Sequence, residues 1–133
     1  MSNQELIWDA VGEECRFEYI DRRKDYVITD TGKCVSLKRS TPHVLRPWIH
    51  TDGYERVTLY LESGKRKEYI HRLVAMAFVP RFYGDVVNHM DGDKRNNAPS
   101  NLEWVTAEEN IRHAHRTGLR NPTHKYMEDK YGV

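Results

Sequence analysis

The chain has 133 residues, of which 38% are hydrophobic and 31% charged, and its net charge is +1. This length and composition predict one ordinary domain with a real core, extended by a small N-terminal sheet, and exclude wholesale disorder. No apolar run reaches the roughly 18 residues that a membrane span needs, and no basic start precedes an apolar stretch as in a secretion signal. We therefore expect a cytoplasmic protein without membrane contact.

The two cysteines, Cys15 and Cys34, are far apart and form no Cys-x-x-Cys pair. This excludes a four-cysteine zinc site, which is a common way to stabilise a small DNA-binding module. We expect two free thiols rather than a disulfide.

Charge is unevenly distributed along the chain. Residues 1–21 carry six acidic residues against one basic residue, whereas residues 22–72 carry twelve basic and six acidic residues. A basic middle segment is able to bind phosphates even in a nearly neutral chain. A solvated surface of mixed charge explains the same composition equally well.

The N-terminal third predicts short strands and turns. YVITDTGKCVSL (residues 26–37) has β-branched residues on both sides of a Gly-containing turn, which indicates a hairpin. YERVTLYL (54–61) alternates apolar and polar residues, and the turn ESGK joins it to RKEYIH (66–71) as a second hairpin. Pro42 and Pro47 mark the connection between the two hairpins.

The pattern changes at HRLVAMAFVP, where apolar residues at helical spacing predict a short buried helix that Pro80 ends. Two strands, DVVNH and NLEWV, follow, separated by a polar loop of about ten residues, whereas ordinary hairpins use two to five. Thr106 and Glu109 form a capping-box pattern for a further helix that Gly118 closes. We expect an irregular tail from residue 119, with His115 and His124 at the surface.

The polar residues of this strand, loop, strand and helix unit suit phosphodiester hydrolysis. That reaction needs an activated water, a cation that bears charge on the phosphate, and a scaffold that holds both. Histidine suits the first role because its unperturbed pKa lies near neutrality, and oxygen ligands suit Mg²⁺. Asn88 and His89 are neighbours at a strand end, so their side chains point to opposite sides. In the next helix, Asn110 and His113 share one face.

The stretch VNHMDGDKRNNAPSNLEWVTAEENIRHA resembles the core of the HNH (ββα-metal) endonucleases, most closely the small phage and intron-encoded homing type. YIHRLVAMAFVP matches the lead-in of that subfamily, and Trp8 with CVSLK resembles more loosely the β module that often precedes the core. The resemblance covers residues 6–118. It implies an α+β fold in which small antiparallel hairpins (residues 1–63) precede the nuclease core with its lead-in strand and helix (64–118) and a C-terminal tail (119–133).

Carried over by position, the resemblance implies a catalytic pair: His89 as general base, and Asn101, which braces the long loop and orients the histidine. The implied metal ligands are Asn88 and Asn110, with His113 as a substitute ligand or a phosphate contact. Asn88 is the main departure, because the family often has Asp or His there and a neutral amide is a weaker ligand for a hard cation. Either metal binding is weak and assisted by phosphate, or a nearby acid such as Asp91 or Asp93 compensates.

The resulting hypothesis is a DNA endonuclease that uses one Mg²⁺ or Mn²⁺ ion and either nicks DNA or cuts both strands, in the host cytoplasm if the gene is phage-encoded. The expected partner is double-stranded DNA, bound by a monomer or weak dimer, and a phage protein is a further candidate partner. Backbone phosphates would be contacted by six basic residues: Lys65, Arg66, Lys67, Arg72, Lys94 and Arg95. The alternatives are a catalytically weakened DNA-binding protein and a phage accessory protein on the same scaffold.

Each residue also has an ordinary structural interpretation. Asn before His at a strand end is usually a turn signal, and the asparagines of the loop are good turn caps. His71 is as much a structural hydrogen-bonding residue as a phosphate contact, and Trp104 is expected in the core. The joint occurrence of all the motif positions, in order and at the right spacing, is what favours the nuclease.

Overall fold

The computed structural model describes residues 2–117, with side chains up to residue 113. The chain begins with helix α1 (Asn3–Val11), where only strands were expected, so that expectation was wrong. The hydroxyl of Ser2 accepts a hydrogen bond from the backbone N–H of Glu5, which caps the helix, and Ile7 and Val11 lie one turn apart on its buried face. Nine residues with two buried apolar positions are a weak periodic signal, which explains why the helix was missed.

The first sheet contains β1 (Phe17–Tyr19), β2 (Tyr26–Thr29), β3 (Cys34–Ser36) and β4 (His43–Val44), all antiparallel in this order. The predicted hairpin is confirmed by β2 and β3, with Val27 opposite Val35. Side chains of α1 pack on these strands and close a small aliphatic core. Cys34 is buried, Cys15 is half-buried, and both are free thiols, as expected.

The second sheet contains β5 (Trp48–Ile49), β6 (Glu55–Leu61) and β7 (Gly64–Tyr69). Leu61 lies opposite Gly64, so Glu62 and Ser63 form the two-residue turn of the second predicted hairpin, which is also confirmed. The boundary expected between residues 63 and 64 falls in this turn, and the hairpin therefore belongs to both proposed units.

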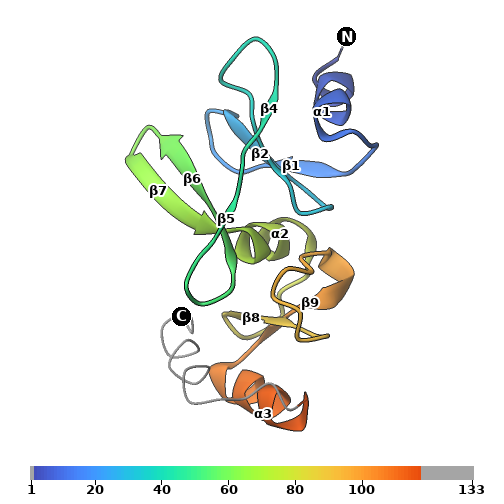
Figure 1. Cartoon of the computed structure of the whole chain (residues 1–133), viewed down its shortest axis with the longest axis vertical. Coiled ribbons are helices and arrows are strands. Elements are labelled where there is room, and N and C mark those ends of the chain that lie inside the picture. The colour runs from blue at the N-terminus through green and yellow to red at the C-terminus, as the bar shows by residue number, and fades with distance from the viewer. Residues whose placement is uncertain (1, 118–133) are drawn as a thin grey trace.

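Helix α2 (Ile70–Phe78) lies at the centre of the molecule, between the two sheets and the C-terminal elements (Figure 1). Its apolar residues join the main core with residues of β2, β6, β8 and β9, and Pro80 follows two residues after its end, as predicted. None of the helices within residues 2–117 is long and apolar enough to cross a membrane.

The C-terminal unit has the order predicted from the sequence: β8 (Val86–His89), the long loop, the 3-10 turn η1 (Pro99–Asn101), β9 (Leu102–Val105) and α3 (Ala107–Thr117). The capping box is present, because Thr106 Oγ1 accepts from Glu109 N and Glu109 Oε1 accepts from Thr106 N. The expected helix end at Gly118, the tail and the side chains of His115 and His124 lie outside the described residues. The fold is α+β, as expected.

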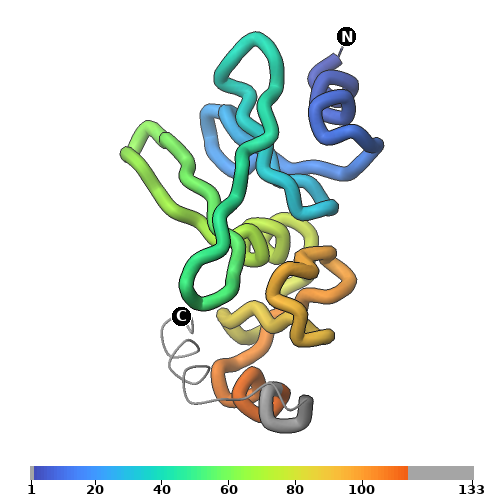
Figure 2. The backbone as a smooth tube through the Cα atoms, in the orientation of Figure 1, coloured from blue at the N-terminus to red at the C-terminus, as the bar shows by residue number. Residues whose placement is uncertain are grey.

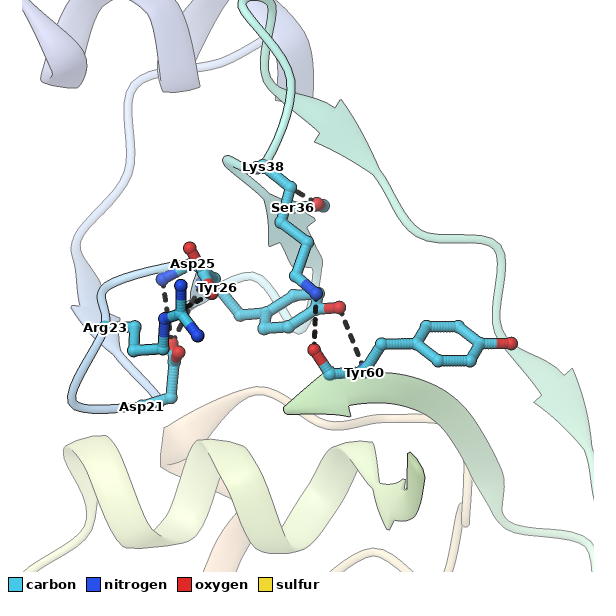
Figure 3. Close-up of polar contacts among 7 residues, drawn as sticks. All are labelled: Asp21, Arg23, Asp25, Tyr26, Ser36, Lys38 and Tyr60. Carbon is cyan, nitrogen blue, oxygen red and sulfur yellow. Dashed lines mark hydrogen bonds and ion pairs between the residues drawn. The ribbon is translucent and has the colours of Figure 1, made fainter. Parts of the chain in front are cut away.

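Side chains of the first sheet cover part of the outer edge of β6 (Figure 3). The backbone N–H of Tyr60 donates to the hydroxyl of Tyr26 at 2.9 Å, and Lys38 Nζ donates to the carbonyl of Tyr60. Strand β5 pairs only with Glu55 and Arg56, so Tyr60 lies beyond it and finds these partners instead. These two bonds fasten the first sheet to the second.

Candidate active site

His89 is the last residue of β8 and is only 4% exposed. Its ring contacts three polar or aromatic groups: Asn97 from the loop, Tyr54 from the segment before β6, and His71 from α2. Directly after it, the N–H of Gly92 donates to the carbonyl of His89 at 2.9 Å, and Gly92 has φ +79°, which an L residue rarely adopts. This turn begins the long loop.

The direct hydrogen-bond partner of His89 is Asn97, whose Oδ1 lies 2.7 Å from His89 Nε2. The amide nitrogen of Asn97 donates to Glu55 Oε1 at 2.9 Å. Figure 2 shows how the segment between β5 and β6 descends beside β8, which brings Glu55 to a loop 42 residues further along the chain. The β6–β7 hairpin and the unit formed by β8, the long loop, β9 and α3 therefore meet next to His89.

An aromatic wall backs the ring of His89. His71 lies 5.0 Å from it between ring centroids and also contacts Tyr54 and Tyr69. Asp52 holds this wall, accepting from the Tyr69 hydroxyl at 2.8 Å and from the backbone N–H of Tyr54. The Nδ1 atom of His71 is buried without a hydrogen-bond partner among the described residues. Burial lowers the pKa of His71 well below its usual value, so this ring is neutral.

Burial also lowers the pKa of His89. The hydrogen bond to Asn97 and the carboxylates of Asp91 and Asp93 act in the opposite direction, and the ammonium of Lys94 lowers the pKa further. The net result is an imidazole that is unprotonated at neutral pH and therefore able to accept a proton.

Asn101 braces the long loop through its side chain. Its Oδ1 accepts from the N–H of Asp91, and its Nδ2 donates to Asp91 Oδ1 and to the carbonyl of Asn96. Asp91 also accepts from Asp93 N and from Asn96 Nδ2, which lowers the pKa of its carboxyl group. The Asp91 carboxylate is thus engaged within the loop, and the side-chain bonds of Asn101 among the described residues go to the loop rather than to His89.

Asn88 and Glu103 are cross-strand neighbours on β8 and β9, and Asn88 Nδ2 donates to Glu103 Oε1 at 2.9 Å. Helix α3 packs on β8, and its residue His113 lies with Nε2 3.0 Å from the carbonyl of Met90, directly after His89. Asn110 lies one turn earlier on the same face and is buried. The structure therefore places His113 at the end of β8 that carries Asn88 and His89, and Asn110 lies on the helix that packs on this strand.

The expected phosphate contacts lie in different surroundings. Lys65, Arg66 and Lys67 are exposed on β7, although Arg66 pairs with Glu68 at 3.0 Å, and Arg95 is exposed in the loop. Arg72 is half-buried, stacks over Trp104 and donates to the carbonyl of Asp85. Lys94 donates to the carbonyl of Asp52 and lies over the ring of Tyr54. Arg72 and Lys94 therefore have structural contacts of their own.

Trp104 is buried, as expected, and donates to the carbonyl of Val79. The sequence did not indicate three contacts of the site: Asn97 with His89, Glu55 with Asn97, and Glu103 with Asn88. The pairing of Asn88 with Glu103 follows from antiparallel register and could have been found by aligning the two strands. No local pattern links Glu55 to the loop.

The chain matches the model of the HNH endonuclease family over residues 68–112. It is 39% identical over 98 residues to the DNA endonuclease I-HmuI of Bacillus phage SP01, which covers 72% of this chain and 55% of that protein. It is 41% identical over 96 residues to the SPbeta prophage-derived putative HNH homing endonuclease YosQ of Bacillus subtilis, covering 69% and 53%. It is 52% identical over 120 residues to the uncharacterized HNH endonuclease L247 of Acanthamoeba polyphaga mimivirus, covering 86% and 27%.

A solved structure, described as DNA binding and cleavage by the HNH homing endonuclease I-HmuI, is similar with a TM-score of 0.71 and 32% identity. The similarity covers 86% of this chain and 66% of that chain, so it includes the N-terminal sheets as well as the C-terminal unit. The chain spans between 27% and 55% of the length of the curated relatives named above.

Proposed function

The chain belongs to the HNH endonuclease family, and we propose that it is a metal-dependent endonuclease that hydrolyses phosphodiester bonds of DNA. The observation that carries this proposal is the position of the His89 imidazole, which is hydrogen-bonded to Asn97 at the end of β8, the strand on which the helix that carries Asn110 packs. The relatives named as DNA and homing endonucleases support DNA as the substrate.

His89 would act as the general base. Its neutral ring takes a proton from a water molecule while the water oxygen attacks the phosphorus. The bond from phosphorus to the 3′-oxygen breaks, and the products are a 5′-phosphate and, after protonation, a 3′-hydroxyl. Asn101 would contribute by keeping the loop in the shape that presents His89, through its bonds to Asp91 and Asn96.

A divalent cation, on which HNH nucleases generally depend, would supply positive charge to the phosphate and the leaving oxygen. The residues present fit a hard cation such as Mg²⁺ or Mn²⁺, because the amides of Asn88 and Asn110 offer oxygen ligands and the carboxylate of Glu103 adds negative charge beside Asn88. Residues 2–113 contain no group of three or more His, Cys, Asp or Glu able to hold a metal. A donor set dominated by amides implies weak binding of a single ion, completed by water and the phosphate.

The DNA backbone would be held by Lys65, Arg66, Lys67, Arg72, Lys94 and Arg95. Of these, Lys65, Lys67 and Arg95 are exposed and have the most freedom to reach phosphates. Such contacts position the duplex without reading its sequence.

A supercoiled-plasmid assay tests this function. We expect nicked or linear product in the presence of Mg²⁺ or Mn²⁺ and none with EDTA, and a His89→Ala chain purified in the same way excludes a contaminating nuclease. Asn110→Ala should shift the Mg²⁺ titration to higher concentration. Binding of plasmid with no cleavage in either metal would contradict the proposal and favour a DNA-binding protein with a weakened site.

A further inference from the structure

The side chain that is hydrogen-bonded to the ring of His89 is that of Asn97, and Glu55 sets its orientation from the far side. A carboxylate is an acceptor only, so the group that Asn97 presents to Glu55 must be its NH₂. The opposite orientation of the amide would place its carbonyl oxygen against the carboxylate and leave both without a hydrogen. The arrangement therefore leaves Asn97 Oδ1 as the atom that faces His89, at 2.7 Å from Nε2.

An amide oxygen is an acceptor only, so the nitrogen of His89 that faces it must carry a proton. In a neutral imidazole only one nitrogen carries hydrogen, and the other has the lone pair that accepts a proton. The two hydrogen bonds that link Glu55 to Asn97 and Asn97 to His89 thus place the proton on Nε2 of His89 and leave the lone pair on Nδ1. If the proton of His89 were on Nδ1 instead, that nitrogen would be an N–H group and would be unable to take a proton from water.

The surroundings keep Asn97 in this position. Its side chain is buried, and the hairpin turn at Gly32 lies beside it, since a Cβ added at Gly32 would be in ordinary van der Waals contact with Asn97 Cβ at 3.5 Å. Glu55 begins β6 and lies next to Tyr54, whose ring contacts His89. The neighbouring residues Tyr54 and Glu55, at the entrance to β6, thus supply part of the aromatic wall behind the imidazole and the carboxylate.

We propose that Asn97 and Glu55 are positioning residues that hold His89 in the tautomer with its proton on Nε2 and its lone pair on Nδ1. This inference rests on the proposed function for its catalytic meaning, but the tautomer itself is a property of the free chain. Glu55 reaches the reaction only through the Asn97 amide, and the two residues are 42 positions apart in sequence.

The test is to replace the hydrogen-bond acceptor at position 55 with a donor and to determine directly which nitrogen of the His89 ring carries the proton. Glu55→Lys replaces an acceptor with a donor, so the Asn97 oxygen should turn to the ammonium and its NH₂ to His89. The ring proton should then move to Nδ1. Nitrogen-15 spectra of the histidine rings in the full chain, without metal or DNA, distinguish the two tautomers, and His89→Ala identifies the signal.

Rescue comes from Asn97→Asp in the Glu55→Lys chain, because a carboxylate accepts with both oxygens. One oxygen then pairs with the lysine and the other receives the proton of His89 Nε2, which restores the original tautomer. In the plasmid assay we expect kcat to fall about tenfold to a hundredfold in Glu55→Lys, a share of what a general base contributes, with KM for DNA not raised. The double variant should recover most of this loss.

The matched control is Glu14→Lys, an exposed residue in the loop after α1 with the same change of charge. It should leave the ring spectra and the cleavage rate unchanged. A wild-type ring with its proton on Nδ1, or a Glu55→Lys chain that is folded and keeps the wild-type ring spectrum, would overturn the inference. A third outcome separates the two proposals. If the wild-type chain shows the expected tautomer and Glu55→Lys reverses it, but the wild-type chain cuts no DNA, the positioning stands and the proposed function fails.

Discussion

The two halves of the molecule differ in what they bury. Around the first sheet and α1, the core is formed by Ile7, Val11, Val27 and Val35, and the buried polar residue there is Thr29. The rest of the described chain buries seven polar or charged residues: Asp52, His71, Asn88, His89, Asn97, Asn101 and Asn110. The first half, formed by α1 and the first sheet, is an aliphatic platform. The second half, formed by the rest of the described chain, buries amide and imidazole side chains around α2.

Burying a polar side chain costs free energy unless it is hydrogen-bonded, and replacing such groups with apolar ones of the same shape is often neutral or stabilising. Stability alone therefore does not explain why so many collect around one end of β8. The bonds of Asn101 to Asp91 and Asn96 hold the loop, and Asn97 of the same loop contacts His89, the proposed base. A fixed arrangement of this kind is what a catalytic site would require. The comparison predicts that changes in the second half affect chemistry, whereas changes in the first affect stability alone.

The largest effect is expected from His89→Ala. Removing the proposed general base should lower kcat for plasmid cleavage by about a hundredfold or more. Affinity for DNA, measured by fluorescence anisotropy, should stay nearly unchanged because the exposed basic residues of β7 are intact. Equal cleavage by the variant would remove His89 from the mechanism.

Ile7→Ala tests the first half. Ile7 is fully buried between α1 and the first sheet, so its truncation should lower the free energy of unfolding by about 2 to 5 kcal/mol in a urea titration. The cleavage rate per folded molecule should not change, and Gln4→Ala on the exposed side of α1 serves as control. A lower rate per folded molecule would show that the platform takes part in catalysis and would break the comparison.

Asn101→Ala should combine both kinds of effect. It removes three part-buried side-chain hydrogen bonds to Asp91 and Asn96, which should lower the free energy of unfolding by about 1 to 3 kcal/mol. Because the loop carries Asn97, the cleavage rate should fall as well. Ser100→Ala, a change at the exposed residue next to Asn101, is the control and should lower neither the free energy of unfolding nor the cleavage rate.

His71→Phe should produce the smallest effect, visible in the pH dependence of stability. Burial lowers the pKa of His71 in the folded chain, so below about pH 6.5 the unfolded chain binds a proton that the folded chain does not. Wild-type stability should therefore fall as pH decreases, by at most about 1.4 kcal/mol per pH unit for this group. The variant should show a shallower fall in thermal unfolding, and an equal slope would contradict the assignment of a neutral buried ring.

Much of the fold was predictable, because its signals are local. The capping box of Thr106 and Glu109, the proline after α2 and the turn of the β6–β7 hairpin each act within a few residues, where sequence spacing determines who meets whom. The roles of His89, Asn101 and Asn110 were inferred from the resemblance of the motif to the HNH endonucleases, and they stay predictions. Helix α1 was missed because its periodicity is short and weak.

The partners of those residues were decided by the tertiary structure. Glu55 meets Asn97, and Lys94 meets the carbonyl of Asp52, across 42 residues in each case, only because α2 joins the second sheet to the strand and loop of the site. Arg72, which remains a proposed phosphate contact, also stacks on Trp104, a contact that the sequence did not indicate. The sequence by itself determined which helix, strands and motif residues form the nuclease-like unit, since these depend on neighbouring residues. Packing around α2 decided which nitrogen of His89 carries the proton, since that depends on a carboxylate distant along the chain.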